Sequence, residues 1–148
     1  MRVHVGSDHA GFELKNALAE HIRSRGHEVV DHGPFVYDPE DDYPPFCLRA
    51  AEATVADSDG LGIVIGGSGN GEQIAANKVK GVYCAITHDV YSAAQGVQHD
   101  NMNVMALGGR VIGTSLGETL VDAFINAEFQ SGTERYLRRF KDVQALEK

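Results

Sequence analysis

The chain has 148 residues, with 21 acidic side chains against 13 lysines and arginines and a formal net charge of −8 at pH 7. This length suits one domain with a hydrophobic core, so we expect a single domain over residues 1–148. The negative charge argues against general binding to nucleic acid or an anionic membrane surface, and no apolar run is long enough to span a membrane.

Apolar runs separated by turn signals predict strands that alternate with helices. The predicted strands cover 2–6, 28–31, 61–65, 82–87 and 103–107, and the predicted helices cover about 12–25, 45–56, 72–78, 89–98, 114–127 and 133–146. Such alternation predicts a parallel sheet with right-handed crossovers and helices on both faces. The expected fold class is therefore α/β, a three-layer α/β/α sandwich with about five parallel strands.

Two further features concern the environment of the chain. The sequence enters its first predicted strand directly after Met1, without a signal-peptide pattern, so we expect a cytoplasmic protein. Cys47 and Cys84 lie in apolar surroundings, where a reduced core thiol is the favoured state.

The connection over 32–44 is long for a compact domain and contains four acids, and loops of this length are often functional.

The glycine loop, Gly66 to Gly71, follows the buried apolar run 61–65 and leads into a predicted helix. Backbone N–H groups in such a turn bind anions and stabilise negative charge that develops during a reaction. The loop lacks the Gly-Lys-Ser/Thr ending of a P-loop and the spacing of the dinucleotide fingerprint, so a turn without chemistry is the alternative. Ser68 and Glu72 flank the same loop, and their presence favours a catalytic site.

Ligands of such sheets bind beyond the carboxyl ends of the strands. Asp8-His9, the glycine loop and Gly108-Gly109-Arg110 all follow predicted strands and are expected there. His99-Asp100 precedes a strand and belongs nominally to the opposite edge. It could reach the site from the preceding helix or from a second subunit.

Several of these residues also have a purely structural interpretation. Asp8 could cap a helix, and Ser68 could bond a neighbouring amide. At Glu72 the helix dipole should lower the carboxyl pKa whereas burial should raise it, and the sequence leaves the outcome open. Arg135 and Arg139 share one face of the last predicted helix, either as a solvated face or as a phosphate clamp. The seven histidines include no pair with metal-ligand spacing.

Taken together, the motifs match a known family. Gly6-Ser7-Asp8-His9-Ala10-Gly11, Asp42-Tyr43-Pro44, Gly67-Ser68-Gly69-Asn70-Gly71, Ile74-Ala75-Ala76-Asn77-Lys78, His99 and Asn103-Val104 resemble the type B ribose-5-phosphate isomerases, a family that includes allose- and galactose-6-phosphate isomerases. The resemblance covers nearly the whole chain. It implies a Rossmann-like sandwich and a homodimer, or a dimer of dimers, whose sites use both subunits and whose last helix reaches across. It also implies no metal and no organic cofactor.

The resemblance assigns the base to Glu72. Many family members carry a cysteine where this chain has Gly66, but an actinobacterial-like subgroup shares Gly-Gly-Ser-Gly-Asn-Gly-Glu and uses the glutamate. His99 is the implied ring-opening group, with Asp8 as its helper. Asp100 stands where the family usually has an asparagine that binds substrate. The residue here departs from that pattern, so the resemblance does not fix the role of Asp100.

The implied reaction is the interconversion of ribose 5-phosphate and ribulose 5-phosphate through a cis-enediolate after ring opening. The amides of Gly67 to Gly71 would hold the enediolate, with Ser68 assisting proton exchange. The remaining expected substrate contacts are Tyr43, His9, Arg110, Arg135 and Arg139, the last two from the partner subunit. The alternatives are an isomerase of a hexose 6-phosphate and a non-catalytic phosphosugar-binding regulator.

Overall fold

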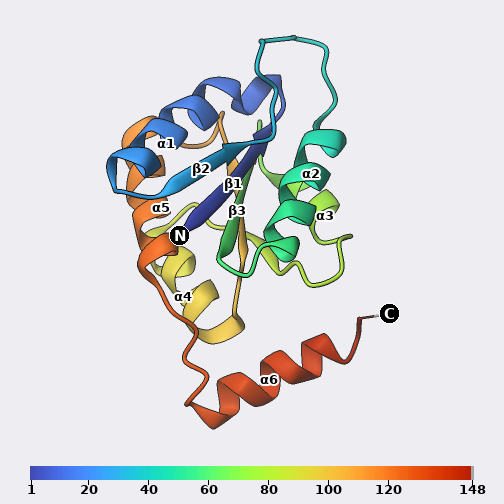
Figure 1. The fold of residues 1–148 in the computed structure, drawn as a ribbon, viewed down its shortest axis with the longest axis vertical. Helices are drawn as coiled ribbons and strands as arrows, with labels where there is room; N and C mark the ends of the chain where they lie inside the picture. The colour runs from blue at the N-terminus through green and yellow to red at the C-terminus, as the bar shows by residue number, and fades with distance from the viewer. Residues whose placement is uncertain (148) are drawn as a thin grey trace.

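The computed structural model describes residues 1–147 and contains one sheet flanked by helices (Figure 1). The strands are β1 (Arg2–Ser7), β2 (Glu28–Asp31), β3 (Gly60–Gly66), β4 (Cys84–Ile86) and β5 (Val104–Gly108). The helices are α1 (Phe12–Ser24), α2 (Tyr43–Ala56), α3 (Asn70–Ala76), α4 (Val90–Asp100), α5 (Thr114–Asn126) and α6 (Glu134–Gln144), and a 3₁₀ turn, η1 (His9–Gly11), joins β1 to α1. Among the residues described, no helix is both long and apolar enough to pass through a bilayer.

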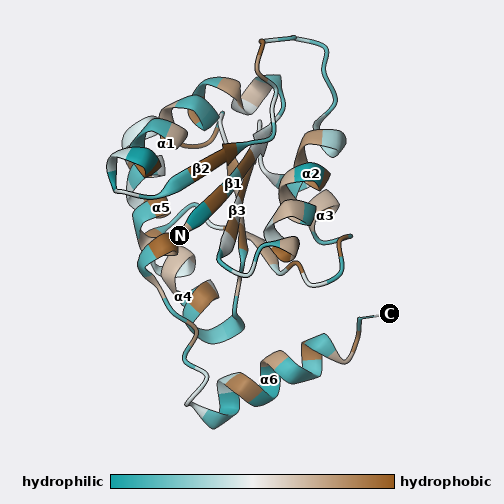
Figure 2. Cartoon of the chain, in the orientation of Figure 1, coloured by the Kyte–Doolittle hydropathy of each residue, from teal (hydrophilic) through white to brown (hydrophobic). Residues whose placement is uncertain are grey.

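The sheet is parallel throughout, with the strand order β2-β1-β3-β5-β4. Its two faces are covered by separate hydrophobic cores, since α1, α4 and α5 pack on one face and α2 and α3 on the other. The middle strands are accordingly the most hydrophobic part of the chain in Figure 2. The expected three-layer α/β/α sandwich is confirmed.

The element boundaries differ from the predicted ones mainly at β4, which is shorter than the predicted strand over 82–87. β4 is an edge strand and pairs only with β5. Just before it, Tyr83 N–H donates to the Asn103 side-chain oxygen at 2.8 Å, and Asn103 Nδ2 donates to the Gly81 carbonyl at 2.9 Å. These side-chain bonds add to the backbone bonds that the Tyr83 carbonyl accepts from Asn103 and Val104 at 3.1 and 3.4 Å, and together they hold the chain just before this edge strand.

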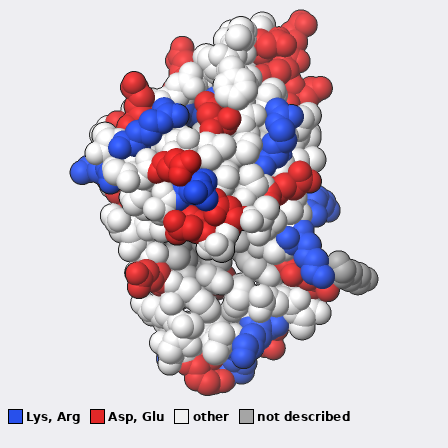
Figure 3. All heavy atoms as spheres, in the orientation of Figure 1, with Lys and Arg blue, Asp and Glu red and all other residues white. Residues whose placement is uncertain are grey.

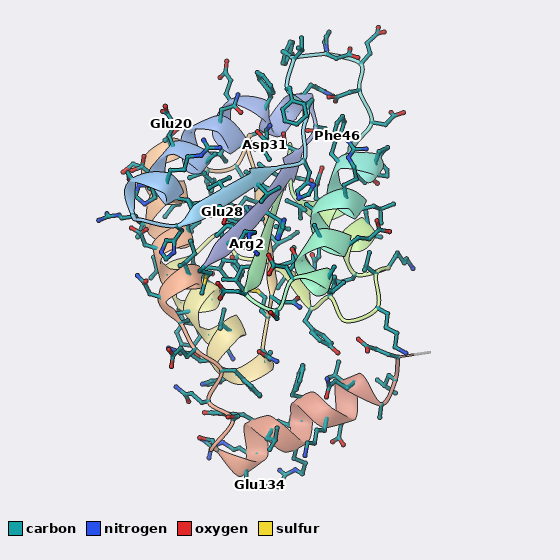
Figure 4. All side chains as sticks on the ribbon, in the orientation of Figure 1. Arg2, Glu20, Glu28, Asp31, Phe46 and Glu134 are labelled. Atoms are coloured by element: carbon teal, nitrogen blue, oxygen red, sulfur yellow. The ribbon has the colours of Figure 1, made fainter. Side chains whose placement is uncertain are left out.

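The surface carries acidic and basic side chains side by side, some of them in salt bridges. Figure 3 shows acidic and basic side chains interspersed over the viewed face, and Figure 4 shows Arg2 and Glu28 on the neighbouring strands β1 and β2. Arg2 Nε donates to Glu28 Oε2 at 3.1 Å. The described surface on this side therefore carries no continuous basic patch, in keeping with the negative net charge.

The last helix, α6, stands apart from the sandwich (Figure 1). None of its residues is buried, although its apolar and charged residues alternate with helical periodicity. It contacts the rest of the chain through aromatic rings, with Phe140 packing edge-on against Tyr83 and Phe129 at centroid distances of 5.0 and 5.3 Å. A helix this exposed gains little from burial within one chain.

Candidate active site

Three segments meet at the carboxyl edge of the sheet, as the sequence predicted. The backbone N–H groups of Gly109 and Arg110 donate to the carbonyls of Gly66 and Gly67 at 2.7 and 3.1 Å. On the other side of β3, the Asp8 N–H donates to the Ile65 carbonyl at 3.3 Å. The ends of β1, β3 and β5 are therefore tied together, because parallel strands place their carboxyl ends at one edge.

The glycine loop is shaped by close backbone contacts. Gly69 has φ of +90°, a left-handed conformation that strongly favours glycine, and α3 begins at the next residue. A Cβ at Gly71 would lie 2.5 Å from the Tyr43 ring, so Tyr43 packs directly on the loop. The Asn70 N–H donates to Ser68 Oγ at 3.2 Å, which is the structural role considered for Ser68, and the Ser68 side chain is exposed.

Glu72 points inward, over the end of β3. Its side chain is only 3% exposed, and a Cβ at Gly66 would collide with its carboxylate. Gly66 therefore provides the space that the Glu72 carboxylate occupies. Burial raises the pKa of Glu72 and the charge of Asp8 adds to this, while backbone N–H groups of Gly69 and Glu72 itself oppose it. Burial prevails, which answers the question that the sequence left open.

Asp8 and His9 follow β1 directly. Asp8 Oδ1 accepts from the N–H groups of Ala10 and Gly11 at 2.9 and 3.2 Å, so Asp8 does cap the short 3₁₀ turn. His9 Nδ1 lies 2.8 Å from Asp41 Oδ1. This bond is the main reason that the pKa of His9 is raised, with smaller contributions from the charges of Asp8 and Asp41.

A positive side chain lies over the glycine loop. The Arg110 side chain is exposed and lies over Gly67, with Nη1 3.5 Å from where a Cβ of that glycine would be. Its charge lowers the pKa of His9 slightly, against the larger effect of the hydrogen bond to Asp41. An arginine over the loop, together with a histidine whose pKa is raised, suits an anionic group such as phosphate.

The other predicted site residues gather around α6. The His99 ring stacks on Tyr136, with centroids 4.0 Å apart, and Arg135 Nη2 donates to the Tyr136 hydroxyl at 3.1 Å. Asp100 and Arg139 line a cavity of about 310 Å³ between α6 and the sheet. Tyr136 was not predicted from the sequence, since one tyrosine on an amphipathic helix carries no special signal.

One chain does not bring these two groups together. Asp8, His9, Ser68, Glu72 and Arg110 lie at the carboxyl edge of the sheet, whereas α6 and the end of α4 lie at the opposite edge (Figure 1). The expectation that His99 and Asp100 belong nominally to the opposite edge is therefore confirmed, and Arg135 and Arg139 lie there too.

Asp41 is a second residue that sequence reasoning missed as a site member. The sequence marks it only as one of four acids in the connection over 32–44, and that position is the available signal. One ligand atom from each of Asp8, His9 and Asp41 lies within 4.8 Å of the others, so this cluster is where a cation could bind among residues 1–147.

The two cysteines take no part in the site. Cys47 and Cys84 are free and buried, as the sequence predicted. Burial raises the thiol pKa at both positions, to about 12 for Cys84. Neither is a nucleophile or base near neutral pH.

Comparison with known proteins points to one family. A family model described as Ribose/Galactose Isomerase matches residues 3–143. The chain is 48% identical to ribose-5-phosphate isomerase B of Mycolicibacterium paratuberculosis, over all of this chain and 92% of that protein, and 36% identical to that of Escherichia coli, over 99% and 96%. A crystal structure of ribose-5-phosphate isomerase B from Mycoplasma genitalium with bound ribulose-5-phosphate superposes with a TM-score of 0.92 at 39% identity, covering 97% of this chain and 94% of that one.

Proposed function

This chain belongs to the ribose/galactose isomerase family, and on that premise we propose that it interconverts ribose 5-phosphate and ribulose 5-phosphate at the glycine loop. It is an aldose–ketose isomerase. The observation that carries the proposal is the buried carboxylate of Glu72, held in the space above Gly66 where the loop begins.

The chemistry requires a base that gives back the proton it takes. Glu72 removes the hydrogen on C2 of the open-chain aldose, and the electrons form the C1–C2 double bond of an enediolate. The same carboxyl then returns the proton to C1 while the C2 oxygen becomes the ketone carbonyl. A raised carboxyl pKa brings the base nearer to neutral pH, where general acid–base catalysis is most effective.

The enediolate needs donors for its oxygens. No side chain caps the start of α3, and the N–H groups of the glycine loop that are not bonded to Ser68 or Glu72 can stabilise an anion there by fixed dipoles without reorganisation. The exposed Ser68 hydroxyl can exchange a proton between the two oxygens. His9 and Arg110 hold the phosphate, and Asp8 binds a sugar hydroxyl.

We infer that a second copy of the chain completes each site. His99, Arg135 and Arg139 lie at the far edge of their own sheet, and both arginines are exposed. In a symmetric dimer the same surface patch serves both subunits, so each site would take its ring-opening histidine and two phosphate-binding arginines from the partner. Asp100 would approach the same substrate, and its charge is tolerated only if the arginines offset it.

Turnover by the purified wild-type chain tests the proposal. The substrates compared are ribose 5-phosphate, allose 6-phosphate and galactose 6-phosphate, under identical conditions. We expect the highest kcat/KM for ribose 5-phosphate. The family model also includes galactose in its description, so a higher kcat/KM for a hexose 6-phosphate would assign the hexose activity instead. Binding of ribose 5-phosphate without turnover would refute the enzymatic assignment.

A further inference from the structure

The connection between β2 and α2 carries four acidic side chains, and one of them turns inward. Asp38, Glu40 and Asp42 are exposed, whereas the side chain of Asp41 is only 9% exposed. An inward carboxylate beside exposed neighbours of the same charge has a specific partner.

The start of this connection is anchored independently. Lys15, which is fully buried, donates from Nζ to both carboxylate oxygens of Asp31 at 2.8 Å and to the Pro34 carbonyl at 2.8 Å. Figure 4 shows Asp31 at the end of β2, where the connection begins. Since that end is held by Lys15, the inward turn of Asp41 is not needed to attach the connection to the sheet.

The partner of Asp41 is His9. Asp41 Oδ1 accepts from the His9 backbone N–H at 2.8 Å and faces His9 Nδ1 at 2.8 Å. A carboxylate only accepts hydrogen bonds, so Nδ1 carries the hydrogen and Nε2 is the ring nitrogen that remains available to a ligand. One oxygen atom therefore sets both the position of the residue and the orientation of its ring.

The second carboxylate oxygen of Asp41 indicates that the inward position of this side chain does not serve the stability of the fold. Asp41 Oδ2 is buried and has no hydrogen-bond partner within residues 1–147. A buried acceptor without a partner destabilises the folded chain. We propose that Asp41 is a positioning residue that orients His9 and favours its cationic form, so that His9 Nε2–H donates to the substrate phosphate. This inference rests on the proposed function, because it takes the phosphate as the ligand of His9.

The charges around His9 have opposing effects on its pKa. Asp41 and Asp8 raise the pKa, whereas burial and the charge of Arg110 lower it. The net direction is upward, so the imidazolium persists to higher pH than an ordinary histidine would allow. Removing the Asp41 charge should therefore shift the loss of phosphate affinity to lower pH.

A cation shared by Asp8, His9 and Asp41 is the rival reading of the same cluster. It is less favoured, because His9 Nδ1 and Asp41 Oδ1 already bond each other and Asp8 Oδ1 already accepts two backbone N–H groups. A metal at Nδ1 would have to displace the proton that this geometry retains.

The test compares Asp41→Asn and Asp41→Ala with the matched control Asp42→Asn, an exposed acid from the same connection. For each protein we would measure kcat and KM for ribose 5-phosphate and the inhibition constant of inorganic phosphate from pH 5 to pH 9. The His9 pKa would be measured by NMR. We expect Asp41→Ala to raise both KM and the phosphate inhibition constant about tenfold, the effect of weakening one charge-assisted hydrogen bond, with kcat within about twofold. Asp41→Asn should keep the ring orientation but lower the His9 pKa, and the control should match wild type.

A His9→Gln background shows whether Asp41 acts on phosphate affinity through His9 or through the stability of the surrounding structure. There, Asp41→Asn should have no further effect on phosphate affinity. An unchanged His9 pKa in Asp41→Asn, an equal loss of affinity in the His9→Gln background, or turnover that chelation abolishes and Zn²⁺ or Mn²⁺ restores would each overturn the inference. If wild type fails to turn over ribose 5-phosphate, the proposed function fails, but the NMR titration and phosphate binding still test the pairing of Asp41 with His9.

Discussion

The two edges of the sheet hold site residues of different kinds. At the carboxyl edge, Glu72 and Asp8 are buried, and His9 is held by the hydrogen bonds that it donates to Asp41. At the amino edge, Arg135 and Arg139 are exposed, and α6 has no buried residue. The first group is oriented by its own chain, because backbone turns and packing hold each side chain. The second group carries exposed charge on a helix without buried residues, which suits residues that bind against another surface.

This contrast predicts two kinds of loss of activity. Changes at Glu72, or at the space that holds its carboxylate, should lower kcat because they alter the reacting group, whereas changes at groups that hold the phosphate should act mainly through KM. In the proposed dimer, changes at the amino edge should act on the site of the other subunit, His99 through ring opening and the two arginines through binding. Four experiments test that division, in order of decreasing expected effect.

Glu72→Gln removes the base while keeping the size of the side chain. We expect kcat to fall by about 10²–10⁴-fold, the usual contribution of a positioned general base. Because burial raises the Glu72 pKa, the folded state favours the neutral carboxyl, and the stability from that preference is lost as pH rises through the raised pKa. The variant should therefore gain thermal stability over wild type at neutral pH and lose that advantage in acid.

Steady-state kinetics and melting curves check both effects. The matched control is Glu13→Gln, an exposed first-turn glutamate of α1, which should behave as wild type. Near-normal turnover by Glu72→Gln would remove Glu72 as the base.

Gly66→Ala tests whether the space above the glycine is what positions the carboxylate. The added methyl would collide with the Glu72 carboxylate, so the base must move. Displacement by about 1 Å can cost about 10²-fold in rate, so we expect kcat to fall by about that much. Gly113→Ala is the control, since a Cβ there meets nothing within 4 Å. Equal activity of the two variants would mean that Glu72 acts from another position.

Mixed dimers test the division between the two edges directly. Glu72→Gln and His99→Ala chains, co-expressed with different tags, would each be nearly inactive alone. If sites are shared, every mixed dimer contains one intact site, so an equal mixture should recover roughly a quarter of wild-type activity. Dimers with one chain of each variant carry both tags, so they can be purified and their activity per site measured separately. Recovery no greater than the sum of the two parents would place both residues in a site formed by one chain.

The smallest expected effect concerns His88, whose Nε2 accepts from the Gly108 N–H at 2.9 Å. Burial lowers the His88 pKa, so this bond is present above the usual histidine range and is lost as pH falls through the lowered pKa. Protonation would free the segment that carries Arg110 and raise KM by roughly 2–10-fold, the value of one neutral hydrogen bond. His88→Gln keeps an acceptor without titrating, so its KM should change less between pH 7 and pH 5 than that of wild type. Identical profiles would show that His88 does not hold this segment.

Much of the site could be found from the sequence because it depends on local order. A glycine run after a buried strand predicts where the loop lies, and spacing alone places Ser68 and Glu72 beside it. The position of His99 before a strand, and not after one, indicated its edge of the sheet. Asp41 and Tyr136 could not be found in this way. Each acquires its role from one contact with a residue distant in the sequence, His9 or His99.

The sequence by itself determined the α/β class and the strand that precedes the glycine loop, because these follow from hydrophobic periodicity and from residue spacing, and its resemblance to the isomerase family implied Glu72 as the base. Only the tertiary structure decided the direction of the Glu72 pKa, the pairing of Asp41 with His9 and the separation of α6 from the glycine loop. Burial, hydrogen bonding across the chain and the placement of a terminal helix are properties of the packed molecule. No local pattern encodes them, since they depend on which distant surfaces meet when the chain folds.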